Sequence, residues 1–134
     1  MGKYLNLEED IFSVFSSSEW IAENIKTFPS NFVEMNGGNT YIRVSIIPSG
    51  TGINEKSISG IVIIDIYTPA GNGPKAATLI ADTLDSYLQN KSISLVSGNV
   101  TQFLQSSFAP KGRDRDTKSL YVTNYTIPFN YFGV

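Results

Sequence analysis

The segment from Gly60 to Asn90 constrains the fold more than any other part of the chain. It begins with the run GIVIIDIY, continues through TPAGNG and ends with PKAATLIADTLDSYLQN. The first run is rich in β-branched residues and apolar on both alternating faces, which predicts an interior strand covered on both sides. Pro69 and the pair Gly71 and Gly73 then favour a turn. From Pro74 onward, apolar residues at three- and four-residue spacing predict a helix that packs one face on a sheet.

The remaining segments predict a single α+β domain, because 134 residues suffice for one core and are short for two. Alternation predicts that Tyr41–Ile47 is a strand that pairs with Ile58–Tyr67. Two short strands, at Ser92–Val96 and Thr101–Ser107, and a final strand, Leu120–Phe129, should complete a mixed, mainly antiparallel sheet. We expect one long helix on the sheet and an N-terminal helix.

The N-terminal helix is expected over Leu7–Ser16, with three carboxylates, Glu8, Glu9 and Asp10, in its first turn. Carboxylates in that position interact favourably with the helix dipole, and this explains them better than a metal site does. Whether the helix continues beyond its serines into Glu19–Lys26, or a second short turn follows, stays open. A short run, Phe32–Met35, is interpreted as either an edge strand or an ordered loop.

Composition excludes most catalytic constellations. The chain has no cysteine and no histidine, so thiolate nucleophiles, cysteine metal sites and the usual general base are missing. A net charge of −2 gives no overall field toward DNA or an anionic membrane. Acidic residues near the N-terminus are unlike a signal peptide, so we expect a soluble protein made in the cytosol.

Two local features admit a functional and a structural interpretation. The turn AGNGPK could offer backbone N–H groups to a phosphate, but it lacks the P-loop lysine and the third glycine of a dinucleotide motif, and Pro74 removes a donor. A plain turn is the favoured interpretation. Asp65, a carboxylate within an apolar strand, needs a partner, and Arg43 on the paired strand is expected to face it.

Two long polar segments, Pro48–Ser57 and Pro110–Lys118, are expected to project from the sheet, either as mobile loops or as loops ordered by a partner. The second carries the chain's only basic concentration, which suits a solvated loop, a contact with DNA or an acidic protein, or salt bridges to a neighbouring copy. Beyond Pro128, Tyr131 and Phe132 are either core residues or anchors on another subunit.

Three stretches together resemble one protein family. The order YIRVSIIPSG, then GIVIIDIYTPAGNGPKAATLIADTLDSYL, then TIPFNYFGV is similar to the tail terminator-like proteins of long-tailed bacteriophages, also described as tail completion or tail-to-head joining proteins. The resemblance covers roughly Phe28 to Val134. Its most specific piece is the strand–turn–helix core around Tyr67–Gly73.

The resemblance implies a structural virion protein at the head-proximal end of the tail. It would form a homo-oligomeric ring, typically a hexamer, that caps the tail tube protein, stops tube polymerisation and meets the head connector, while DNA passes through the channel. Members have no catalytic residues and no cofactor. The two polar loops and the C-terminal aromatics become the expected contact sites, with these candidate residues: Asn54, Glu55, Lys56, Lys111, Arg113, Arg115, Lys118, Tyr131 and Phe132. The alternatives are a monomeric ligand- or phosphate-binding domain and another ring protein of the same junction.

Overall fold

The computed structural model describes residues 3–29, 40–51, 56–71, 74–95, 98–113 and 120–133. The helices are α1 (Lys3–Phe15), α2 (Ser18–Ala22) and α3 (Lys75–Leu88). The strands are β1 (Thr27–Pro29), β2 (Tyr41–Thr51), β3 (Ile58–Pro69), β4 (Ser92–Ile93), β5 (Val100–Phe103), β6 (Ser107–Arg113) and β7 (Leu120–Phe132). No helix of these ranges is long and apolar enough to cross a membrane.

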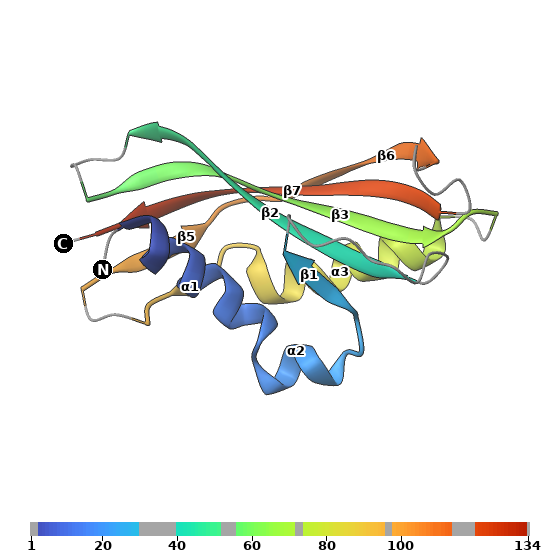
Figure 1. The fold of residues 1–134 in the computed structure, drawn as a ribbon, viewed down its shortest axis with the longest axis horizontal. Coiled ribbons are helices and arrows are strands. Elements are labelled where there is room, and N and C mark those ends of the chain that lie inside the picture. The colour runs from blue at the N-terminus through green and yellow to red at the C-terminus, as the bar shows by residue number, and fades with distance from the viewer. Residues whose placement is uncertain are drawn as a thin grey trace.

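The strands form one sheet in the order β1-β2-β3-β7-β5-β4, and β6 also pairs with β7. Among the described strands, β1 and β2 form a parallel pair and the other pairs are antiparallel. The three described helices lie on one face of this sheet, which we call the inner face (Figure 1). Within the described residues, the opposite, outer face carries no helix. The fold is therefore a single α+β domain with a mixed, mainly antiparallel sheet, as the sequence predicts.

The predicted central strand is confirmed as interior, because β3 pairs with β2 on one side and with β7 on the other. Its inner-face residues, such as Val62 and Ile64, are fully buried, whereas Ile61 and Ile63 on the outer face are only half-buried. The predicted cover on both sides is thus complete on the inner face and partial on the outer face. Gly60 allows close packing, since an added Cβ would lie 2.3 Å from the carbonyl oxygen of Ile47.

The core lies between the inner face and the helices. Helix α3 buries the predicted stripe against β3, and its buried residues are Ala77, Ile80, Ala81, Leu84 and Leu88. Below it, Trp20 of α2 packs edge-on against both Phe15 and Tyr87, with ring centroids 5.1 and 5.2 Å apart. Ser17 caps α2 by accepting from the Trp20 amide at 3.2 Å, so a second short helix follows α1.

Helix α1 begins at Lys3, four residues before the predicted start, which corrects the role assigned to its carboxylates. Glu8, Glu9 and Asp10 lie in the second turn, beyond the reach of the N-terminal dipole. Asp10 is instead buried, 2% exposed, and accepts hydrogen bonds from Thr101 Oγ1 at 2.8 Å and from the Leu95 amide at 3.3 Å. It therefore joins α1 to the β4–β5 region.

Strands β5 and β6 share one edge of β7 and are separated by an irregularity at 104–106. Phe103 is paired with Phe129, and Ser107 with Thr126, so one extra residue is accommodated between them. Ser106 turns toward α3, where its hydroxyl oxygen lies 2.5 Å from Asp85 Oδ1 and 2.9 Å from Gln89 Oε1, close enough for these two acceptors to share its single proton. The buried Tyr125 hydroxyl donates to the same Asp85 oxygen.

The two polar segments are shorter as loops than predicted. β2 extends to Thr51 with a register shift at Pro48/Gly50, and β6 includes Pro110–Arg113 with a similar shift at Pro110/Gly112. Proline is tolerated there because β6 has its second edge unpaired within the described ranges. The run at 32–35 lies outside the described residues.

Candidate interaction surfaces

The outer face of the sheet carries a row of apolar residues across neighbouring strands. Ile47, Ile61 and Pro128 are aligned in register on β2, β3 and β7, and Leu104 donates its amide to the Pro128 carbonyl at 2.9 Å. Ile47 is 41% exposed and Leu104 is 39% exposed. None of the described helices covers this face (Figure 1), so the row forms an apolar surface that is suited to contact with another protein.

Toward the end of the outer face where β2 begins and β3 ends, the side chains aligned across neighbouring strands are first polar and then aromatic. Arg43 lies directly opposite Asp65, which confirms that the two residues face each other across paired strands. Arg43 also donates to the Tyr67 hydroxyl at 3.1 Å and lies 5.2 Å from the centre of that ring. Tyr67 stacks on Tyr41 at 4.4 Å, and this pair forms a second, smaller core with Leu120 and Val122.

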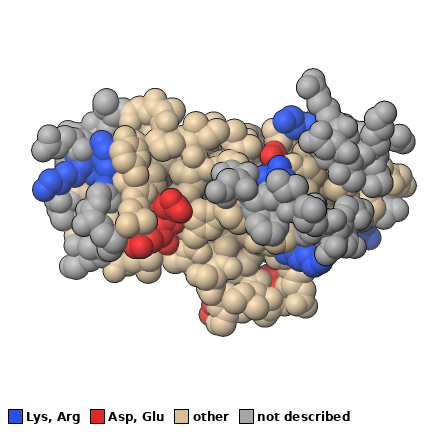
Figure 2. All heavy atoms as spheres, viewed as in Figure 1, with Lys and Arg blue, Asp and Glu red and all other residues tan. Residues whose placement is uncertain are grey.

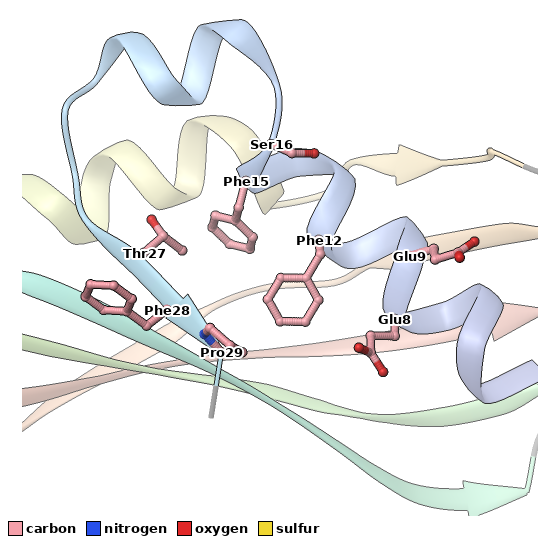
Figure 3. A pocket seen from close by; sticks show the side chains of 8 residues that line it. All are labelled: Glu8, Glu9, Phe12, Phe15, Ser16, Thr27, Phe28 and Pro29. Carbon is pink, nitrogen blue, oxygen red and sulfur yellow. The ribbon is translucent and has the colours of Figure 1, made fainter. Parts of the chain in front are cut away.

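A pocket of about 420 Å³ lies between α1 and β1. Figure 3 shows Phe12 and Phe15 pointing from α1 toward Phe28 and Pro29 of β1. Glu8 and Glu9 add two exposed carboxylates to the lining, and Figure 2 shows acidic side chains gathered over α1. The complete lining is Glu8, Glu9, Phe12, Phe15, Ser16, Thr27, Phe28 and Pro29. The pocket thus combines an aromatic interior with negative charge.

The pocket cannot be predicted from the sequence, because it is formed by two elements that come into contact only in the folded protein. A signal is present in α1, where Glu8, Phe12 and Phe15 are spaced by four and three residues and so lie on one helix face. That spacing indicates an apolar stripe, but nothing in the sequence identifies the three-residue strand β1 as its neighbour.

The candidate contact residues divide between two ends of the sheet. Lys56 is exposed and lies against Gly133, next to the half-buried Phe132 at the end of β7. Lys111 is exposed on β6, and the backbone of Arg113 pairs with Tyr121 near the start of β7. Phe132 follows Tyr121 by eleven positions along β7, which corresponds to a distance of about 36 Å between the two ends of the strand.

Tyr131 serves the core. It is 1% exposed and pairs with Ile58 on one side and Thr101 on the other, because β7 continues through Pro128 to Phe132. In this conformation it offers no surface to a partner. The remaining candidates, Asn54, Glu55, Arg115 and Lys118, lie outside the described residues.

The turn before α3 does not have the lining of an anion site in its described part. A cavity of about 300 Å³ beside it is lined by Pro69, Gly71, Pro74, Pro110 and Tyr121, none of them cationic. Pro74 is the N-cap of α3 and makes no side-chain capping bond. Gly71 has φ +92°, the left-handed conformation that the turn requires. Within the described ranges, no group of three or more metal-ligating side chains gathers.

Comparison with known proteins shows the fold alone. No protein-family model matches the chain, and no curated protein matches it. One solved chain is 13% identical and superposes with a TM-score of 0.67, covering 98% of this chain and 94% of that one. A second, from the virion of a native gene transfer agent particle, is 14% identical with a TM-score of 0.53, covering 98% and 92%.

Proposed function

We propose that this protein is a structural component of a phage-like virion. The observation that carries the proposal is its likeness in fold to a chain of the gene transfer agent virion, which extends over nearly the full length of both chains. The three sequence stretches that resemble tail terminator-like proteins support the same conclusion independently. Such a role needs no cofactor and no catalytic residue.

Within the virion, we assign the chain to the head-proximal end of the tail. Copies of it form a ring, six in the simplest case, that caps the tail tube, stops its growth and meets the head connector while DNA passes through. The surfaces suit this role, because the outer face, which carries none of the described helices, and the two ends of the sheet can provide separate contacts to different neighbours. Repetition around a ring makes individually weak contacts strong in sum.

The alternative of a phosphate-binding domain is disfavoured by the apolar described lining beside Gly71. The other alternative, a different ring protein of the same junction, would differ from a terminator in how it assembles rather than in its chemistry. A tube subunit elongates into long tubes, whereas a terminator stops at a ring. Calorimetric titration with phosphate ligands, expected to show no heat of binding, separates the first alternative from the assembly role.

The decisive experiment mixes the purified protein with tail tubes of the virus that encodes it. We expect electron microscopy to show one ring at a single end of each tube, and native mass spectrometry to show a discrete oligomer. Tubes that keep growing in its presence, with no density added at either end, would refute the terminator role. Long tubes formed by this protein itself would identify a tube subunit instead.

A further inference from the structure

We propose that neighbouring copies of this chain contact each other head-to-tail, with Phe108 and Lys111 on β6 of one copy entering the α1–β1 pocket of the next. This inference rests on the proposed ring and names the residues that join its subunits. The pocket residues that matter are Glu8, Phe12, Phe15 and Phe28.

The two patches lie on opposite sides of the subunit, which is what a head-to-tail ring requires. β1 lies at one edge of the sheet, and β6 pairs with β7 on the far side of β2 and β3. Four strand spacings correspond to a separation of about 19 Å across the sheet. A contact between two different patches in this arrangement generates a ring when the rotation closes.

The edge of β6 is suited to a side-chain contact rather than to strand addition. Phe108 is 50% exposed although it is a large aromatic, and Lys111 is exposed at the register shift three residues later. Pro110 has no amide to donate, and the shift between Pro110 and Gly112 breaks the ladder. A neighbouring copy therefore meets protruding side chains at this edge.

The pocket complements these side chains in chemistry and in spacing. Its aromatic interior suits Phe108, and the exposed carboxylates of Glu8 and Glu9 suit the Lys111 ammonium group. From Phe108 to Lys111, three strand residues span about 10 Å. From Phe15 to Glu8, seven helical residues also span about 10 Å. Residues three apart in a regular strand point to opposite faces, but the register shift between Pro110 and Gly112 interrupts this alternation at Lys111. With Lys111 redirected by the shift, Phe108 can lie between Phe15 and Phe28 while Lys111 reaches Glu8.

In this alignment Ser107 of one copy lies near Ser16 of the next, which allows a direct test. The chain has no cysteine, so Ser16→Cys and Ser107→Cys introduce a single pair of exposed thiols. Under mild oxidation we expect a ladder of disulfide-linked oligomers on denaturing gels, ending at the ring size. Each single variant can form no more than a dimer. The matched control, Ser16→Cys with Ser86→Cys, places the second thiol on the exposed side of α3 and should give no ladder.

A charge exchange provides the second test. Lys111→Glu should lower the population of assembled oligomer at least tenfold in sedimentation velocity at low salt, and adding Glu8→Lys with Glu9→Lys to the same chain should restore it. Phe108→Ser should weaken assembly similarly, whereas Leu79→Ser, at a residue 56% exposed on α3, should not. Circular dichroism confirms that each variant is folded.

The outcomes separate this inference from the proposed function. If the wild-type protein caps tubes but the Ser16/Ser107 pair gives no ladder and Lys111→Glu assembles normally, the contact assigned here is wrong and the function stands. If the ladder forms but the protein never associates with tube ends, the contact is right and the terminator role fails. A ladder as strong in the Ser16/Ser86 control would also overturn the contact.

Discussion

At the scale of single residues, the Tyr125 hydroxyl illustrates how a buried polar group is accommodated. Tyr125 is 1% exposed, and burial, together with its hydrogen bond to Asp85, raises its pKa well above the usual value of 10.0. The folded state therefore favours the protonated phenol. Below about pH 10 the tyrosine is protonated in both states, and its stabilising contribution is fully present.

Above pH 10 the unfolded chain releases this proton and the folded chain does not, so the free energy of unfolding should fall by up to about 1.4 kcal/mol per pH unit. Tyr125→Phe removes this dependence and also costs about 1 kcal/mol at pH 8 through the lost hydrogen bond. We therefore expect the stability gap between wild type and variant to narrow between pH 10 and pH 11. Urea unfolding at each pH measures the difference in the free energy of unfolding between the two proteins. A difference that stays constant from pH 10 to pH 11 would contradict the raised pKa of Tyr125.

Gly50 on β2 and Gly60 on β3 differ in the atoms that an alanine side chain at the same position would contact. At Gly60 an added Cβ lies 2.3 Å from the Ile47 carbonyl oxygen and 2.9 Å from Pro48 Cα, both fixed backbone atoms. At Gly50 it lies 2.7 Å from Ser59 Oγ, which can rotate away. We expect Gly60→Ala to lower the free energy of unfolding by about 1–3 kcal/mol, and Gly50→Ala to change it by less than about 1 kcal/mol. Equal effects in urea unfolding would show that the hairpin relaxes at both positions.

At the scale of elements, the sequence predicts those helices and strands whose pattern of apolar residues can be recognised within a short stretch of chain. Helix α3 and strand β3 follow directly from their apolar spacing, and their packing confirms it. The sequence PKGR in β6 is typical of a loop, but the structure pairs it with β7 as an extended strand. Similarly, the carboxylates of α1 resemble a helix start because local sequence cannot show that Asp10 is buried against β5.

The attachment of α1 to the sheet gives a prediction at this scale. Asp10→Ala removes the acceptor for the buried Thr101 hydroxyl and for the Leu95 amide. We expect a loss of about 1–3 kcal/mol in the free energy of unfolding and faster hydrogen exchange at Leu95. Glu9→Ala, an exposed position on the same helix, should stay within about 0.5 kcal/mol. Unchanged exchange at Leu95 would mean that Asp10 does not hold the β4–β5 region.

At the scale of the whole molecule, the long β7 strand keeps the candidate contacts apart. Lys111 lies toward its first residues and Lys56 toward its last, about 36 Å away along the strand. A sequence alone does not reveal this separation, since both lysines belong to polar segments of similar appearance. We therefore expect the two lysines to contact different neighbours, and one charge change at each end of the sheet tests this expectation.

We expect Lys56→Glu to leave the ring intact and to impair attachment to a neighbouring virion component, whereas Lys111→Glu should impair the ring itself. The physical reason is distance, because a charge change at one end of the sheet is screened beyond about 10 Å and cannot act on the other end. Native mass spectrometry should show that Lys56→Glu forms the same oligomer as the wild type. Electron microscopy should show tubes or heads to which this variant oligomer is not attached. Lys91→Glu, an exposed lysine after α3, is the matched control and should behave as wild type. Loss of the oligomer in Lys56→Glu, with its unfolding free energy unchanged, would place the subunit contact at the other end of β7.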